Sequence, residues 1–152
     1  MNTAAPVDPV AARLVVEAAL SKVGAPFEHY AAGPDAFDCR GFTVWAWAQA
    51  GVELPRSAKQ QAMTLPQLPV ADAEPGDIVF YADPGLENAH VGIYIGGAQI
   101  CHADYDPGVE YTPMTQLVGA SGRVQISSLF YREPWIAMRP ATQVRCRDDE
   151  RA

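Results

Sequence analysis

Cysteines are scarce in this 152-residue chain, and the three that are present do not pair. Cys39, Cys101 and Cys146 are an odd number without paired spacing, which excludes a regular disulfide framework and leaves at least one thiol free. The sequence also lacks the CxxC and HxxxH elements of common zinc sites. We therefore expect no metal and no cofactor.

Positive charge is also scarce, and it does not cluster. Eleven Lys and Arg residues are outnumbered by 18 Asp and Glu, so the net charge is -7 and the pI is about 4.8. Such a surface repels nucleic acid and anionic lipid. We expect neither nucleic-acid nor membrane partners.

Long apolar runs are absent as well. No stretch approaches the roughly 20 residues that a membrane-spanning helix needs, and the first residues lack the basic start of a signal peptide. We predict no signal peptide. Three interpretations stay open: a cytoplasmic protein, a protein exported by a route without a cleaved signal, and a domain of a longer chain.

The composition that remains, 49% hydrophobic and 19% charged, is typical of a single globular domain. We expect a flexible N-terminus over residues 1–8, one domain over 9–140 and a charged, disordered tail over 141–152. Helical signals dominate the first half. Asp8 and Asp38 are placed to cap helices over 9–23 and 39–50, and Ser57 is placed to cap a short third helix.

The second half has the pattern of short strands. Runs rich in β-branched and aromatic residues cover 77–81, 90–96 and 98–103, with a hairpin turn at Gly96–Gly97. A loose region over 104–130 and a last strand ending at Pro140 are expected to follow. Helices first and a small antiparallel sheet afterwards predict an α+β fold.

Cys39 is the thiol that the sequence marks as a nucleophile. It follows Asp38 at the start of a predicted helix, where unpaired backbone N–H groups and the helix dipole favour a thiolate. Cys101 lies inside a predicted strand and Cys146 in the tail. Both are more simply explained as buried or idle thiols.

A cysteine nucleophile needs an imidazole and a third polar group that orients it. His90 opens one predicted strand, and His102 lies near the end of the next. With the turn at Gly96–Gly97, the residue opposite His90 is Ala103 or a neighbour, so the two histidines can share one face of the hairpin. His29, in a proline-rich loop, is interpreted as structural or as part of a substrate subsite.

Three separated stretches resemble the NlpC-type family of papain-like cysteine peptidases, which act on bacterial cell walls. These are GAPFEHYAAGPDAFDCRGF with the later LPRS, then PGDIVFY with HVGIYIG, and finally CHA, which together span about residues 10–105. The resemblance implies a papain-like fold in which Cys39 attacks a peptide carbonyl, His90 moves the proton and His102 orients His90. It also implies that the backbone N–H of Cys39 contributes to an oxyanion hole.

The family typically cleaves the bond between D-glutamate and diaminopimelate, or a neighbouring bond, in the peptidoglycan stem peptide. Asp104 is the nearest substitute for His102 as orienting residue. Asp38 either caps its helix or also binds the free amine of the substrate, and both roles stay open. Arg56 and Ser57 match a family motif that we interpret as a turn and a helix start.

The chain departs from the family pattern beside the nucleophile. Arg40 stands where the family usually has Ser, and Phe27 stands where it often has Tyr. Tyr30 is a candidate to supply a hydroxyl from a shifted position. Arg40 either pairs with a substrate carboxylate or is a solvated residue of the first helical turn.

These residues favour a peptidoglycan endopeptidase over two competing functions. One is a pseudoenzyme that holds the cell wall with an altered groove, and the other is acyl transfer on lipids, in whose permuted relatives the histidine precedes the cysteine. The missing signal peptide favours a phage lysin, a tail-associated hydrolase or an antibacterial effector. An immunity protein or a larger phage assembly are the partners that such settings imply.

Overall fold

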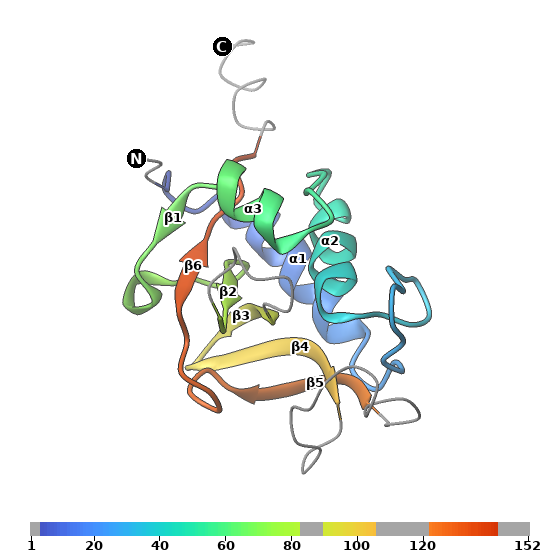
Figure 1. Ribbon diagram of the computed structural model, residues 1–152. Helices are drawn as coiled ribbons and strands as arrows, with labels where there is room; N and C mark the ends of the chain where they lie inside the picture. The colour runs from blue at the N-terminus through green and yellow to red at the C-terminus, as the bar shows by residue number, and fades with distance from the viewer. Residues whose placement is uncertain (1–3, 83–89, 106–121, 143–152) are drawn as a thin grey trace.

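A six-stranded antiparallel sheet with helices on one face makes up the protein (Figure 1). The computed structural model describes residues 4–82, 90–105 and 122–142. In chain order the elements are α1 (Pro9–Ser21), α2 (Cys39–Ala48), α3 (Ala58–Thr64), β1 (Gln67–Leu68), a 3-10 turn (Val70–Asp72), β2 (Ile78–Phe80), β3 (Val91–Gly96), β4 (Gln99–Tyr105), β5 (Gly122–Ser128) and β6 (Ile136–Met138). The α+β prediction is confirmed.

The three helices begin at the capping residues that the sequence predicts. The Asp8 carboxylate accepts from the N–H groups of Val10 and Ala11, and Ser57 accepts from the N–H of Gln60. Asp38 caps α2 through its side chain. Because each cap satisfies an N–H group that the helix itself leaves unpaired, these residues fix where the helices start.

The strands lie in the order β1-β6-β2-β3-β4-β5. Strands β3 and β4 form the predicted hairpin, with Ile93 opposite Cys101 and Tyr94 opposite Ile100. Extending this register places His90 opposite Asp104, one residue beyond Ala103. His102 is then the diagonal neighbour of His90 on the same face, as the alternation along strands requires.

The prediction of a loose region over 104–130 is wrong for residues 104–105, which belong to β4, and for residues 122–128, which form β5. Strand β5 pairs with β4 from Gln99–Ser128 to Tyr105–Gly122, and residues 106–121 lie outside the described residues. The sequence signal of β5 was weak because GRVQISS is mostly polar, and Val124 is its one buried residue. Strand β1 was also missed, since its two residues are a strand only through pairing with β6.

The sheet separates two apolar clusters of unequal size. The larger one lies under α1 and α2 and includes the fully buried Phe37, Phe42 and Phe80. Val79 and Ile100 point to the other face, where they meet Leu129 and partly buried tyrosines. Burying a large apolar side chain contributes about 1.5–3 kcal/mol, so the helix-covered cluster carries most of the stability.

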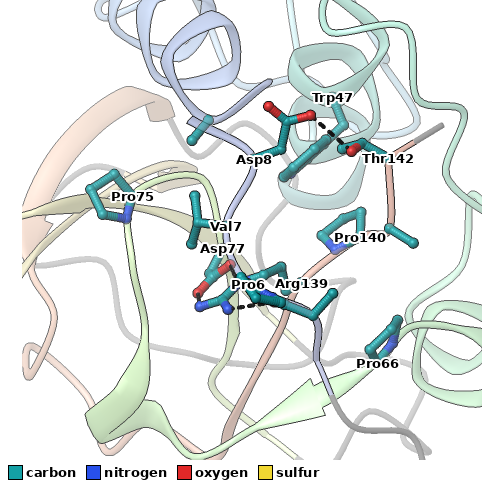
Figure 2. A pocket seen from close by; sticks show the side chains of 13 residues that line it. Pro6, Val7, Asp8, Trp47, Pro66, Pro75, Asp77, Arg139, Pro140 and Thr142 are labelled. Carbon is teal, nitrogen blue, oxygen red and sulfur yellow. Dashed lines mark hydrogen bonds and ion pairs between the residues drawn. The ribbon is translucent and has the colours of Figure 1, made fainter. Parts of the chain in front are cut away.

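Arg139, near the end of the described chain, forms an ion pair with the buried Asp77 and also bonds to the N-terminal segment. Arg139 donates from Nε to Asp77 Oδ1 and from Nη2 to Asp77 Oδ2, both at 2.9 Å, and its Nη1 donates to the carbonyl of Ala5. A pocket of about 290 Å³ lies beside this pair, lined by both terminal segments and by Trp47 (Figure 2). Residues 4–8 and 139–142 are therefore packed against each other. The expected flexible ends stay a prediction for residues 1–3 and 143–152, which are outside the described residues.

No helix among the described residues has the length and apolar character that crossing a bilayer requires.

Candidate active site

Cys39 is the first residue of α2, and its position depends on a close contact between that helix and the preceding loop. Asp38 Oδ1 accepts from the N–H of Gly41 at 2.6 Å, and the N–H of Asp38 donates to the carbonyl of Ala31. A Cβ atom at Gly41 would overlap the Ala31 carbonyl oxygen. The glycine therefore lets the loop press directly onto the first turn, which holds the half-buried Cys39 in place.

The second carboxylate oxygen of Asp38 is also engaged. Arg56 Nη2 donates to Asp38 Oδ2 at 2.8 Å, so the two motif residues bind each other. Of the two roles left open for Asp38, the structure shows the capping one. Binding of a substrate amine stays a prediction.

His90 and His102, hereafter the histidine pair, are joined by a short hydrogen bond. His90 Nε2 lies 2.7 Å from His102 Nδ1, and His102 Nε2 lies 2.9 Å from Ser127 Oγ on β5. Gly92 makes room for this arrangement, because a Cβ there would lie 3.2 Å from His102 Cβ. The two histidines are therefore neighbours, as the hairpin register predicted.

The tautomer of the histidine pair determines which ring nitrogen of His90 can accept a proton. If His90 Nε2 carries the hydrogen, it donates to His102 Nδ1, and His102 then donates from Nε2 to Ser127 Oγ. This tautomer leaves Nδ1 of His90 as an acceptor. In this tautomer the hydrogen bonds from His90 through His102 to Ser127 leave His90 Nδ1 able to accept a proton.

Helix α2, which begins at Cys39, packs against β3, the strand that His90 directly precedes. The backbone of Val91, the first residue of β3, lowers the pKa of the Cys39 thiol. Burial nevertheless raises the pKa of Cys39 to about 11, against the lowering effects of Arg40 and Val91. Burial therefore opposes the lowered pKa that we expected for Cys39 from its place at a helix N-terminus.

Burial acts on the histidine pair in the opposite sense. Burial, with a smaller contribution from the Arg132 guanidinium, lowers the pKa of His90 to about 3. Burial, the charge of His90 and Arg132, acting against Asp104, lower the pKa of His102 to about 3. Both imidazoles are therefore neutral near pH 7. A neutral imidazole beside a protonated thiol is the state from which a proton can move from sulfur to nitrogen.

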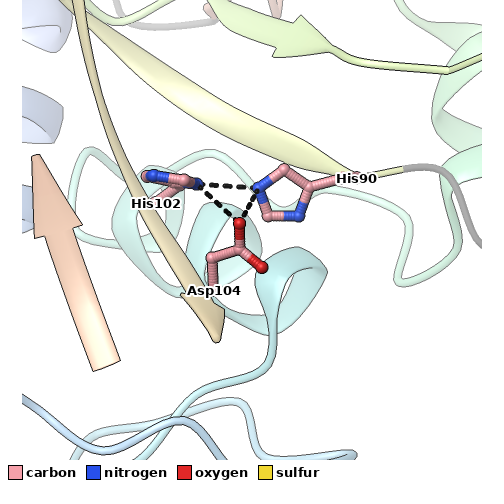
Figure 3. Close-up of side chains that lie close together, drawn as sticks. All are labelled: His90, His102 and Asp104. Carbon is pink, nitrogen blue, oxygen red and sulfur yellow. Dashed lines mark hydrogen bonds and ion pairs between the residues drawn. The ribbon is translucent and has the colours of Figure 1, made fainter. Parts of the chain in front are cut away.

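Asp104 approaches the hydrogen bond between the histidines. Its Oδ2 lies 3.8 Å from both His90 Nε2 and His102 Nδ1, and the three side chains form the triangle in Figure 3. Tyr131 and Arg132 reach the same oxygen, each at 3.5 Å. All three members of the triangle are buried.

The triangle has the ligand types of a metal site, and its ligand atoms lie within 4.8 Å of one another. However, the two ring nitrogens are already hydrogen-bonded to each other, and a guanidinium stands beside the carboxylate. Both features oppose a cation at this point. We therefore interpret the triangle as a hydrogen-bonded acid–base group.

Two aromatic rings, those of Tyr105 and Phe27, pack together beside His29. Tyr105 packs on Phe27 with ring centroids 4.8 Å apart, and its hydroxyl lies 3.0 Å from His29 Nε2. Burial raises the pKa of Tyr105, and the charges of Asp104 and Cys39 act in the same direction. Tyr30, our candidate for a replacement hydroxyl, is 81% exposed. The hydroxyl beside Phe27 belongs to Tyr105.

Sequence reasoning missed four residues of this region: Ser127, Tyr131, Arg132 and Tyr105. Ser127 is one polar residue in a polar strand, and the two residues after Phe130 lie between β5 and β6. No local pattern marks them, because β5 and the segment after it reach the histidines only through sheet pairing. Cys101 is fully buried, as expected, and Cys146 lies outside the described residues.

Known proteins are similar to this chain in sequence and in fold. The profile of the NlpC/P60 family matches residues 24–126, more than half of the chain. A probable endopeptidase of Mycobacterium tuberculosis is 41% identical over 102 residues, which are 66% of this chain and 26% of that protein. The chain thus spans about a quarter of the length of this curated relative.

Solved structures with the same fold include one from Staphylococcus aureus, similar to a lipoprotein of the NLP/P60 family. It has a TM-score of 0.70 at 25% identity over 91% of this chain and 44% of that one. The NlpC/p60 domain of the peptidoglycan hydrolase SagA has a TM-score of 0.66 at 26% identity, covering 84% and 97% of the two chains.

RipD of Mycobacterium tuberculosis is described as a non-catalytic NlpC/p60 domain protein adapted to peptidoglycan binding. Its TM-score is 0.63 at 24% identity, covering 85% of this chain and 96% of that one. At this identity the likeness shows the fold alone.

Proposed function

Because the chain belongs to the NlpC/P60 family, we propose that it is a cysteine endopeptidase that cleaves the stem peptides of bacterial peptidoglycan. The observation that carries the proposal is the position of Cys39, at the start of α2 and beside the strand that His90 opens. The hydrogen bond from His90 to His102 supplies the orienting group that such a cysteine needs.

The proposed reaction begins with one proton transfer. His90 accepts the thiol proton at Nδ1, and the Cys39 thiolate attacks the peptide carbonyl. Burial disfavours a lone charge on either group, so the two charges arise together. His90 then gives the proton to the leaving amine, and a water activated by His90 hydrolyses the thioester.

The first turn of α2 is the proposed oxyanion site. The backbone N–H of Cys39 lies at the helix N-terminus, where N–H groups and the helix dipole favour negative charge. An oxyanion formed on the attacked carbonyl would be adjacent to it. Loss of one such donor typically reduces kcat by about 10²–10³-fold.

For the scissile bond we propose the link between D-glutamate and diaminopimelate, which the family resemblance supports. Asp38, Arg40, Phe27 and Tyr30 are the proposed substrate-binding residues. Digestion of defined muropeptides, with mass spectrometry of the products, tests both the activity and the bond. Equal products from the native protein and Cys39→Ala would overturn the proposed activity.

A second candidate function is binding of the cell wall without cleavage. Arg40 and Phe27 at the altered groove favour it, and the RipD fold shows that a non-catalytic protein can adopt this architecture. Sacculus sedimentation separates the two candidates. Retention of the native chain on sacculi with no soluble muropeptide released would favour binding.

The proposed place of action is the bacterial cell wall, reached by non-classical export, by phage release or within a larger protein. A phage lysin, a tail hydrolase and an antibacterial effector all fit this proposal. Holin, tail or immunity genes beside the coding sequence would distinguish them.

A further inference from the structure

The proposed reaction places a positive charge on a histidine pair that water barely reaches. His90 is 4% exposed and His102 is 1% exposed, so an imidazolium there needs a charge of opposite sign nearby. The carboxylate of Asp104 is the negative group nearest to both rings among the described residues.

We infer that Asp104 is a positioning residue whose carboxylate stabilises the positive charge that the histidine pair carries after Cys39 gives up its proton. The inference rests on the proposed acid–base function of the pair. At 3.8 Å from both ring nitrogens, Oδ2 is too far for an ordinary hydrogen bond to either. Asp104 therefore acts through its charge, while His102 acts as the hydrogen-bond partner of His90.

The carboxylate is held at this distance by other groups. Asp104 Oδ1 accepts from the N–H of Tyr105 at 2.8 Å, and the Tyr131 hydroxyl lies 3.5 Å from Oδ2. The same hydroxyl lies 3.5 Å from His102 Nδ1. The Tyr131 hydroxyl therefore lies beside both the carboxylate and the ring, at the same distance from each.

Arg132 opposes Asp104 electrostatically. Its Nη2 lies 3.5 Å from Asp104 Oδ2, and its charge lowers the pKa of both histidines, whereas Asp104 raises the pKa of His102. Asp104 also raises the pKa of the Cys39 thiol, as the smallest of the effects on that group.

Several titratable or charged groups face the histidine pair or Cys39, and the test must separate Asp104 from them. They come from α2, the end of β2, β4 and the segment between β5 and β6: Asp38, Cys39, Arg40, Tyr81, Asp104, Tyr105, Tyr131 and Arg132. Asp104 and Arg132 carry opposite full charges beside the pair, with Asp104 Oδ2 and Arg132 Nη2 3.5 Å apart.

The test follows alkylation of Cys39 by iodoacetamide at pH 7 and at pH 10, with mass spectrometry of the Cys39 peptide. At pH 7 the reactive thiolate depends on proton transfer to His90, whereas at pH 10 direct ionisation contributes. The measured quantity is the alkylation rate at pH 7 divided by the rate at pH 10. We expect Asp104→Asn to lower this ratio by about 3–10-fold, since a nearby charge shifts a pKa by about a unit. Arg132→Gln should raise the same ratio.

Two further variants guard against a purely structural effect. Asp104→Glu keeps the charge and should restore most of the ratio, and Asp77→Asn, a buried carboxylate with no contact to the pair, should leave it unchanged. An unchanged ratio in folded Asp104→Asn would overturn the inference, as would shifts of the same sign in Asp104→Asn and Arg132→Gln. If Asp104→Asn does not fold, an Arg132→Gln ratio that fails to rise overturns it alone.

This readout needs no peptide substrate. A chain that alkylates as expected but releases no muropeptide would keep the Asp104 inference and contradict the endopeptidase proposal. Cleavage by the native chain together with an unchanged ratio in Asp104→Asn would keep the endopeptidase proposal and contradict the Asp104 inference.

Discussion

Two buried aspartates, each beside an arginine, have opposite surroundings. Asp77 is 2% exposed and accepts two bonds of 2.9 Å from Arg139 and one of 2.8 Å from the N–H of Glu74. Asp104 is 5% exposed, yet Arg132 stays 3.5 Å away and the two histidines 3.8 Å away.

The contacts of Asp77 are those of a structural carboxylate, whereas Asp104 has longer ionic contacts to several neighbours. Short, well-aligned bonds neutralise Asp77, which fastens β6 and residue 5 to the turn before β2. The ionic contacts of Asp104 are longer, and we infer that its charge acts on the histidine pair. A similar depth of burial thus accompanies a tightly bonded structural carboxylate at one site and, at the other, a carboxylate for which we infer a role in acid–base chemistry.

The largest expected effect is on stability at the Asp77 site. Asp77→Ala leaves the guanidinium of Arg139, whose side chain is 13% exposed, without its carboxylate, which typically costs about 3–5 kcal/mol. Asp104→Ala should cost less, because its ionic contacts are longer. Urea unfolding at pH 7 measures both. A larger loss for Asp104→Ala would reverse the comparison.

Burial of the histidine pair should make the free energy of unfolding fall in acid. The folded pKa values of His90 and His102, about 3, lie below the unfolded value of 6.5, so only the unfolded chain binds these protons between the two. Stability should therefore fall as pH drops below 6.5, by about 1.4 kcal/mol per pH unit for each histidine.

Urea unfolding between pH 6.5 and pH 5, before most carboxylates titrate, measures this slope. His102→Gln removes one of the two titrations and should flatten it, while Asp77→Asn should retain the native slope. A slope in His102→Gln as steep as in the native chain would contradict the assigned shift.

Removing the last group of the hydrogen-bond line should have a moderate effect on activity. Ser127→Ala takes away the partner of His102 Nε2, so His102 can adopt the tautomer that turns His90 away from base function. A neutral hydrogen bond contributes about 0.5–1.5 kcal/mol, which predicts a kcat lower by roughly 2–13-fold.

Stem-peptide hydrolysis measures this loss, and Ser128→Ala is the matched control, since Ser128 accepts from the N–H of Phe130 instead. Equal rates for the two variants would show that Ser127 does not set the tautomer.

The smallest expected effect concerns Arg40, the cation beside the nucleophile. Its charge lowers the pKa of Cys39 against burial, so Arg40→Ala should slow alkylation of Cys39 at pH 8 by about 2–3-fold. Arg40→Lys keeps the charge and should react like the native chain. A Lys variant as slow as the Ala variant would assign the effect to packing instead.

The sequence by itself determined the helices and the chemistry-bearing residues. Asp8, Asp38 and Ser57 start helices through bonds to N–H groups two or three positions away, so their signal is local. The hairpin around Gly96–Gly97 is local too, and it placed the two histidines on one face to within one residue of register.

Only the tertiary structure decided what surrounds those residues. Ser127, Tyr131 and Arg132 reach the histidines because β5 pairs with β4, and the sequence separation of these contacts leaves no periodic trace. Burial is likewise a property of the packed molecule, and it raised the pKa of Cys39 where the helix N-terminus alone predicted a lowered one. Burial has this effect because it removes the water that would stabilise the charged thiolate, and the extent of burial is set by packing between segments far apart in the sequence.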